Sequence, residues 1–185
     1  MTERVKQLSM KTKWNMKNYL LFLFLLVIGT ALPVLIHGLA LRYAGKMFTP
    51  LHFPIFIGAM TLGGKSAVLL GVLIPLISYF LTGRPPLFPF GAAMMFEFAI
   101  FGLISSYLYK KRGINIYLAL IAAMILGRIG LLTARYVYSL SFGGHFSFTG
   151  MMTSLFLTGL PGTITQLALI PIIVKMLEWL LKTDF

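Results

Sequence analysis

The sequence predicts an all-α membrane protein built around a bundle of six transmembrane helices. First, 58% of the residues are hydrophobic and 11% are charged, whereas soluble domains carry about 25% charged residues. Second, apolar runs approaching the roughly 20 residues of a membrane-spanning helix recur along the chain. Third, 185 residues leave room for little besides helices and turns. We therefore expect one membrane domain over residues 18–185, preceded by a basic interfacial segment at 1–17.

Each apolar run predicts one helix, and the connections between the helices are short. The second helix is the shortest, and the turn Gly63-Gly64-Lys65 joins it to the third. Proline inside a helix removes a backbone hydrogen bond, so we expect a kink at Pro33 and interruptions of the last helix at Pro161 and Pro171. The six expected helices span residues 19–43, 51–62, 66–81, 91–109, 114–140 and 151–181.

Lysine and arginine are distributed unequally between the two ends of these helices. With a cytoplasmic N-terminus, eleven of them lie on the cytoplasmic side, and the outer side carries only Arg42, Lys46 and Arg84. Membrane proteins retain positive charge in the cytoplasm, and tryptophan gathers at the interfaces. Trp14 and Trp179 fall at the same, inner interface in this arrangement. We therefore expect both termini in the cytoplasm.

Several classes of function are disfavoured by the residues that the chain lacks. It has no cysteine, which excludes thiol catalysis and disulfides, and its scattered basic residues form no nucleic-acid face. Gly64-Lys65-Ser66 resembles the end of a phosphate-binding loop, but position 59 is alanine and an apolar helix precedes it. Hydrolase motifs are absent, and the single aspartate, Asp184, lies in the tail. We expect no enzyme activity, catalytic residue, metal site or cofactor.

Ionisable groups inside the expected spans are candidates for function, because a charge in hydrocarbon is costly. At about 1.5 Å per residue, Glu97, Arg135 and His37 lie at similar depth in the outer half of the membrane. Arg128 and Gln166 lie deeper. Two interpretations stay open at this point. Glu97 pairs with Arg135 or Arg128 and only holds two helices together, or these groups orient a ligand in an apolar pocket.

Two loops rich in proline, glycine and phenylalanine, residues 82–90 and 141–150, lie above these groups. Pro85-Pro86 stiffens the first loop, and flanking glycines offer pivots. We expect this loop to act as a lid over the pocket. Phenylalanines beside the polar groups, together with the arginine of the loop, add candidates for ligand contact: Phe53, Arg84 and Phe88.

Three stretches resemble the substrate-binding S components of energy-coupling factor (ECF) vitamin transporters. The first is PLHFPIFIGAMTLGGKSAVLLG at residues 50–71, with an H-x-P helix start and a Gly-Gly-Lys turn. The second is LTGRPPLFPFGAAMMFE at residues 81–97, and the third is LPGTITQLALIPIIVK at residues 160–175. Length, six spans and a cytoplasmic N-terminus agree with this family over nearly the whole chain.

The resemblance implies a multi-pass protein of the bacterial plasma membrane that captures a vitamin or vitamin precursor with high affinity. It implies a pocket near the outer face, closed by the loops between helices 1 and 2 and between helices 3 and 4. It also implies partners: a transmembrane coupling subunit and two ATPase subunits, with surrounding lipid and no nucleic acid. The expected substrate-binding residues are Glu97, Arg135, Arg128, His37, Phe53, Arg84, Phe88 and Gln166.

These residues narrow the substrate to two candidate classes. Within the family, the M-M-F-E sequence is most similar to a branch that carries cobalamin-related precursors such as dimethylbenzimidazole, and pantothenate-type components come next. A free carboxylate at Glu97 suits a ring N–H or a cation, whereas an unpaired Arg128 or Arg135 suits a carboxylate ligand. The alternative from a different class is a small membrane scaffold or assembly protein without a ligand.

Overall fold

The computed structural model describes residues 14–38, 49–83, 86–142 and 147–182. For residues 36–38, 156 and 182 it describes the backbone only. These residues form helices and turns and contain no strand, so the all-helical prediction is confirmed. Short π-helical turns adjoin three of the helices: η1 (Leu87–Gly91), η2 (Tyr107–Lys111) and η3 (Thr153–Thr158). The α-helices are α2 (Met16–Gly38), α4 (His52–Thr61), α5 (Gly64–Thr82), α6 (Ala92–Ser106), α7 (Ile116–Phe142), α8 (Phe148–Met152) and α9 (Leu160–Lys182).

Five helical segments within the described residues are long and apolar enough to cross a membrane. They are Met16–Leu35, Gly64–Thr82, Leu87–Lys111, Ile116–Phe142 and Phe148–Leu181. The helix α4 has ten residues and rises about 15 Å, half of the roughly 30 Å hydrocarbon core. The second expected span is therefore shorter than a membrane crossing.

Helix boundaries differ from the sequence-based expectation in two places. The expected helix at 151–181 is divided: α8 and η3 precede α9, which begins at Leu160. Pro161 then falls in the first turn of α9, where a missing N–H costs no helical hydrogen bond. The end of the expected loop at 82–90 forms the turn η1, which leads into α6 and in which the backbone of Phe88 is extended and not helical. The expected extension of the first helix beyond residue 38 lies outside the described residues.

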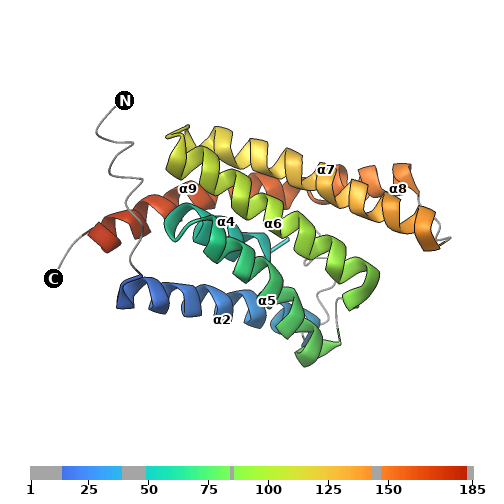
Figure 1. The fold of residues 1–185 in the computed structure, drawn as a ribbon, viewed down its shortest axis with the longest axis horizontal. Coiled ribbons are helices and arrows are strands. Elements are labelled where there is room, and N and C mark those ends of the chain that lie inside the picture. The colour runs from blue at the N-terminus through green and yellow to red at the C-terminus, as the bar shows by residue number, and fades with distance from the viewer. Residues whose placement is uncertain (1–13, 39–48, 84–85, 143–146, 183–185) are drawn as a thin grey trace.

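The helices are arranged so that α5, α6 and α7 pack side by side, with α2 and α7 on opposite sides of the bundle (Figure 1). The first turn of α2 and the last turn of α9 lie at the same end of the molecule (Figure 1). The α4–α5 turn and the connection from η2 to α7 lie there too. The basic residues of these segments, Lys17, Lys65 and 110–112, therefore gather toward one end.

The packing between α5 and α6 depends on small residues. A Cβ on Gly102 would lie 2.6 Å from the Cβ of Ala67, and a Cβ on Gly71 would lie 2.8 Å from the Cβ of Phe98. Neither distance is sterically possible, so both positions need glycine for the two backbones to approach this closely. Such small-residue contacts are a main source of helix association in lipid, where apolar side chains gain little by leaving the solvent.

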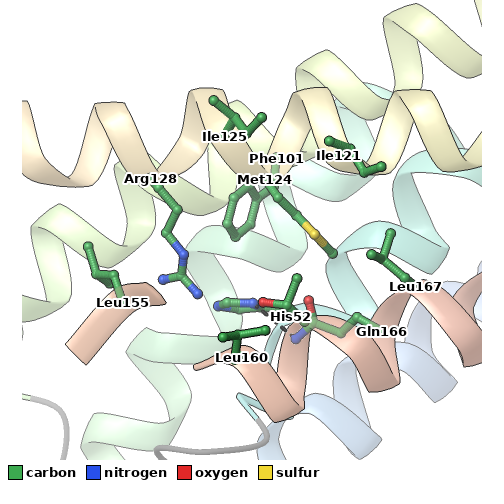
Figure 2. A pocket seen from close by; sticks show the side chains of 11 residues that line it. His52, Phe101, Ile121, Met124, Ile125, Arg128, Leu155, Leu160, Gln166 and Leu167 are labelled. Atoms are coloured by element: carbon green, nitrogen blue, oxygen red, sulfur yellow. Dashed lines mark hydrogen bonds between the residues drawn. The ribbon is translucent and has the colours of Figure 1, made fainter. Parts of the chain in front are cut away.

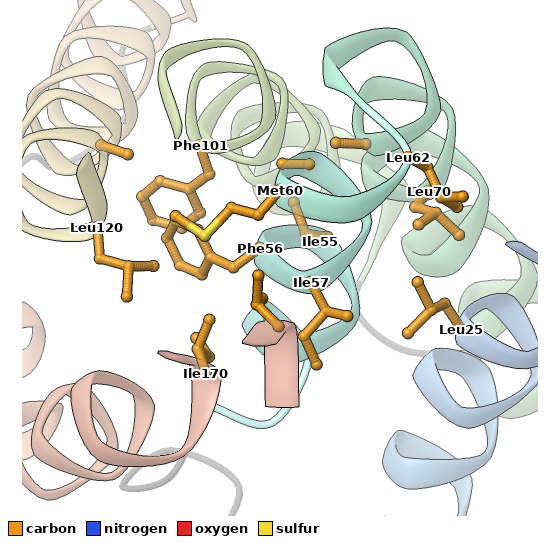
Figure 3. Packing of buried hydrophobic residues seen from close by; sticks show 14 of the residues in the cluster. Leu25, Ile55, Phe56, Ile57, Met60, Leu62, Leu70, Phe101, Leu120 and Ile170 are labelled. Carbon is orange, nitrogen blue, oxygen red and sulfur yellow. The ribbon is translucent and has the colours of Figure 1, made fainter. Parts of the chain in front are cut away.

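The short helix α4 is enclosed by the rest of the bundle. Nine of its ten residues are buried, and it packs against α2, α5, α6 and α9. Figure 3 shows Phe56 and Met60 of α4 among Phe101, Leu120 and Ile170, which come from α6, α7 and α9. Because its C-terminal turn lies at one end of the bundle and its length is half a crossing, α4 begins in the interior at about half depth.

A lysine from a different helix caps the C-terminal end of α4. The Nζ atom of Lys110 donates a hydrogen bond to the carbonyl oxygen of Thr61 at 2.7 Å. Beside it, the Tyr109 hydroxyl donates to Oε2 of Glu178 at 3.1 Å, which connects η2 to α9. These two contacts hold α4, η2 and α9 together at the end where the basic residues gather.

Replacing this lysine tests whether the cap stabilises the fold. The substitution Lys110→Met keeps the aliphatic stem and leaves the Thr61 carbonyl without a donor. We expect the free energy of unfolding in detergent micelles to fall by about 1–3 kcal/mol, the cost of an unsatisfied buried acceptor. Lys65→Met is the matched control, because Lys65 is exposed at the same end, and its effect should stay within about 0.5 kcal/mol. Equal effects of both substitutions would show that Lys110 acts only through its charge.

Candidate functional site

The interior start of α4 carries a buried hydrogen-bonded group formed with α9. Nε2 of Gln166 lies 2.7 Å from Oγ1 of Thr49 and 3.3 Å from Nδ1 of His52. Gln166 is 1% exposed and His52 is 4% exposed. Buried polar groups are costly unless they are hydrogen-bonded, so these contacts fix α9 against the first turn of α4.

Aromatic rings hold the His52 side chain in place. The centroid of its ring lies 5.4 Å from that of Phe98 and 5.0 Å from that of Phe101, both in edge-to-face geometry. Phe56, one turn along α4, stacks on Phe101 at 4.9 Å. Such edge-to-face contacts favour a single orientation of each ring. The imidazole is therefore positioned by both its hydrogen bond and its aromatic neighbours.

An ion pair between α6 and α7 lies next to this group. Nη1 of Arg128 donates to Oε1 of Glu97 at 2.8 Å, and the side chains are 13% and 2% exposed. Glu97 and Phe101 are four residues apart and so share one face of α6. A Cβ on Gly127 would lie 2.2 Å from the Phe101 ring, so the glycine before Arg128 allows α7 to approach that face. A charge this deeply buried is tolerated because it is paired.

A cavity of about 190 Å³ lies between α4, α6, α7, η3 and α9. In Figure 2 the Arg128 guanidinium is directed toward the His52 ring, with Gln166 beside the ring. The polar residues of the wall are His52, Arg128, Thr163 and Gln166, and the apolar ones are Phe101, Ile121, Met124, Ile125, Leu155, Leu160 and Leu167. A mostly apolar wall with a few convergent polar groups is the usual composition of a small-molecule site.

The structure brings three of the predicted site residues together. Arg128 and Gln166 line the cavity, and Glu97 is joined to it through its ion pair with Arg128. Of the two pairings that the sequence left open, the structure contains the one with Arg128. The guanidinium of Arg135 instead lies over the ring of Phe90, 4.4 Å from its centroid.

The other predicted residues do not line this cavity or are not described. Phe88 is 61% exposed and packs against Tyr138 and Phe142, and Phe53 packs at the edge of the hydrophobic core. The side chain of His37 and the whole of Arg84 lie outside the described residues. None of the described residues of the expected lid, 82–83 and 86–90, is part of this cavity wall.

Sequence analysis missed His52 and Thr163 as site residues. Thr163 carried no signal, because threonine is common in membrane helices. His52 did carry one: it starts an apolar helix too short to cross the membrane, so its ring must lie inside the bundle. The described residues contain no group of three or more His, Cys, Asp or Glu side chains that could hold a metal ion. The site offers hydrogen-bond donors, acceptors and apolar contacts, which are the means of binding a ligand.

Comparison with known families gives one match. A sequence model of the family described as "ECF transporter, substrate-specific component" matches residues 20–174, which include every residue of the cavity wall. No curated protein and no solved structure matches the chain. The family named by the resemblance in the sequence is therefore confirmed, and the match carries no information on the substrate.

The buried ion pair can be tested without a ligand. Glu97→Gln leaves the Arg128 charge buried and uncompensated, so we expect the free energy of unfolding to fall by about 3–5 kcal/mol. The double variant Glu97→Gln/Arg128→Gln should recover part of this loss, because the two residues interact directly. Arg135→Gln is the control and should cost about 1 kcal/mol or less, since it removes only a partly exposed cation–π contact. Additive effects in the double variant would contradict the pairing.

Proposed function

Because the chain belongs to the substrate-specific components of ECF transporters, we propose that the cavity beside His52 and Arg128 is its substrate-binding pocket. The protein would then capture a vitamin or vitamin precursor for import. The observation that supports this proposal best is the placement of a largely apolar cavity, with four polar residues in its wall, within the membrane-spanning bundle. The residues proposed to bind substrate are His52, Arg128, Thr163 and Gln166, with Glu97 positioning Arg128.

The size and charge of the cavity favour a small, uncharged substrate. An engineered apolar cavity of about 150 Å³ binds benzene, so a cavity of about 190 Å³ suits one or two fused rings. The positive charge of Arg128 is already balanced by Glu97. A carboxylate ligand would add an uncompensated negative charge to a buried site, which is costly. A cobalamin-related precursor such as dimethylbenzimidazole is thus our first candidate, and pantothenate, which carries a carboxylate, is the second.

The arrangement of the helices supports the proposed topology of six passes with both termini in the cytoplasm. With α4 counted as the second pass, successive passes run in opposite directions, and α2 begins at the end where α9 finishes (Figure 1). Lys17, Lys65 and 110–112 gather at this end, and positive charge marks the cytoplasmic side. We propose that residues 18–185 form one membrane domain of the bacterial plasma membrane, preceded by an interfacial segment at 1–17.

Transport requires partners that supply energy. The chain contains no complete phosphate-binding loop, and its family is a substrate-specific component, not an enzyme family. We propose that it works with a transmembrane coupling subunit and two ATPase subunits of the same transporter class. The alternative of a scaffold without a ligand is disfavoured by the cavity itself, because its polar groups converge on a space that a scaffold would fill with apolar side chains.

Because the proposed partners hydrolyse the ATP, we expect the isolated chain to bind its substrate without transporting it against a gradient. Reconstituted alone into proteoliposomes, it should bind radiolabelled dimethylbenzimidazole or pantothenate in a saturable way and should not concentrate either one when ATP is present on both sides. Uptake against a gradient should appear only with the coupling and ATPase subunits. Accumulation by the chain alone would contradict the proposal.

The location of the pocket can be tested by filling it. Met124 is buried in the cavity wall, so Met124→Trp should occupy the cavity and abolish the ligand-dependent rise in melting temperature that a binder shows. Leu118→Trp is the matched control on the same helix, because Leu118 is 61% exposed, and it should leave ligand stabilisation unchanged. Ligand stabilisation that survives Met124→Trp in folded protein would place the pocket elsewhere.

A further inference from the structure

The contacts of Gln166 determine which nitrogen of His52 carries the proton. Nε2 of Gln166 lies 2.7 Å from Oγ1 of Thr49 and 3.4 Å from the Thr49 carbonyl oxygen. A carbonyl oxygen only accepts hydrogen bonds, so the group that faces it is the amide NH₂ and not the amide oxygen. The same NH₂ faces Nδ1 of His52 at 3.3 Å, and its second hydrogen is donated there.

It follows that His52 is a neutral imidazole protonated on Nε2. Nδ1 accepts the hydrogen bond from Gln166 and so has no proton of its own, which leaves the ring proton on the other nitrogen. A doubly protonated ring would place an N–H group against the NH₂ of Gln166. The nearby Arg128 charge further disfavours a positive ring. His52 therefore presents an N–H donor at Nε2.

Two polar atoms of the cavity wall are left without a partner among the described residues and are accessible within the cavity. Among the described residues, no group pairs with Nε2 of His52 and none donates to Oε1 of Gln166. Both side chains are more than nine-tenths buried, and both residues line the cavity. A ligand that fills the cavity and leaves either atom without a partner incurs the free-energy cost of an unsatisfied buried group, whereas a ligand that pairs with both does not.

The donors of the wall come from α4 and α7, and the acceptors come from α9. Arg128 gives one N–H group to Glu97 and keeps others, and its guanidinium is directed toward the His52 ring (Figure 2). Together with the His52 N–H, these groups form a donor side. The Thr163 hydroxyl donates to the Gly159 carbonyl oxygen at 3.1 Å, so its oxygen is left as an acceptor in the wall that also contains Gln166. The cavity is thus polarised, although its charges balance.

We infer that this site selects a small neutral heterocycle that carries a ring-nitrogen acceptor and, across the ring, an N–H donor. The acceptor takes the Nε2 hydrogen of His52, and the N–H group faces Oε1 of Gln166. His52 is the residue that determines specificity, and Gln166 fixes its tautomer as well as contacting the ligand. The inference rests on the proposed function, because it assigns a ligand class to the same cavity.

The test uses five probes of similar shape on the purified wild-type protein. Benzimidazole has both the acceptor and the N–H group, 1-methylbenzimidazole has only the acceptor, indole has only the N–H group, indene has neither, and benzoate is an anionic acceptor. We expect benzimidazole to bind at least about tenfold more tightly than any other probe, since each analogue leaves a buried polar atom unpaired. Calorimetry or thermal shifts give the ranking. Indole or indene binding as tightly as benzimidazole would overturn the inference, and so would a preference for benzoate.

Variants assign the selectivity to named residues. His52→Phe keeps the ring and its aromatic contacts but removes the donor, so the preference of benzimidazole over indole should disappear. Met124→Trp should abolish binding of all five probes. A preference that survives His52→Phe would overturn the role of His52. In case that variant does not fold, the ¹⁵N chemical shifts of histidine in the wild-type protein report the tautomer directly, and a His52 signal protonated at Nδ1 would overturn the inference as well.

The outcomes separate this inference from the proposed function. If dimethylbenzimidazole or pantothenate binds and Met124→Trp blocks it, the cavity is the substrate pocket whatever the ranking of the probes. If the five probes then bind with similar affinities, only the inferred roles of the donor and acceptor groups are wrong. If neither compound nor any probe binds a folded protein, the proposed pocket itself is wrong.

Discussion

A helix of ten residues cannot cross a hydrocarbon core of about 30 Å. The packing of the other helices depends on this constraint, because α4 must end inside the protein and be enclosed there. Its backbone starts in the interior, where the first N–H groups of a helix have no partner in lipid. The protein surrounds α4 with four other helices. At the interior end the N–H groups of His52 and Phe53 donate to the carbonyl oxygens of Thr49 and Pro50, and at the other end Lys110 donates to Thr61. The same arrangement leaves His52, the first residue of α4, facing a cavity at half depth.

Two different kinds of contact stabilise the two ends of this helix. At the end of the bundle, Lys110 caps the last carbonyl of α4, and a lysine is acceptable there because its stem runs along the helix and its charge lies toward the interface. In the interior, hydrogen bonds among the uncharged side chains of Thr49, His52 and Gln166 connect the start of α4 to α9. The choice of neutral groups at depth follows from the cost of a charge in the membrane.

The ion pair that the described residues form at depth fits the same rule. Glu97 and Arg128 neutralise each other across α6 and α7, so the cavity wall contains strong donors without a net charge. An arginine has five N–H groups, and pairing with one carboxylate oxygen does not use them all. Neutralisation and ligand binding are therefore compatible, and the two interpretations of Glu97 that the sequence left open are not exclusive. Glu97 lies behind Arg128 and orients it, while Arg128 lines the cavity.

The sequence by itself determined the all-helical fold, the membrane location and the family. These depend on composition, on the length of apolar runs and on local motifs, and each of those is a property of the linear chain. It also identified charged and amide groups within apolar runs as candidates, namely Glu97, Arg135, Arg128, His37 and Gln166. The structure brings Glu97, Arg128 and Gln166 of these to one cavity. The positions of helix ends such as Leu160 were less accurate, since Gly159 and Pro161 are compatible with more than one boundary.

Only the tertiary structure decided which side chains meet. Arg128 and Arg135 are two turns apart on one helix, and the sequence left both open as partners of Glu97. In the structure α7 approaches the Glu97 face of α6 at Gly127 and so brings Arg128, the deeper of the two, to the carboxylate. His52 and Gln166 are separated by 114 residues, and their contact depends on α9 packing against the interior end of α4. The tautomer of His52, and with it the donor that the cavity presents, follows from that contact. Pairings between distant helices are set by packing geometry, which no local pattern in the chain encodes.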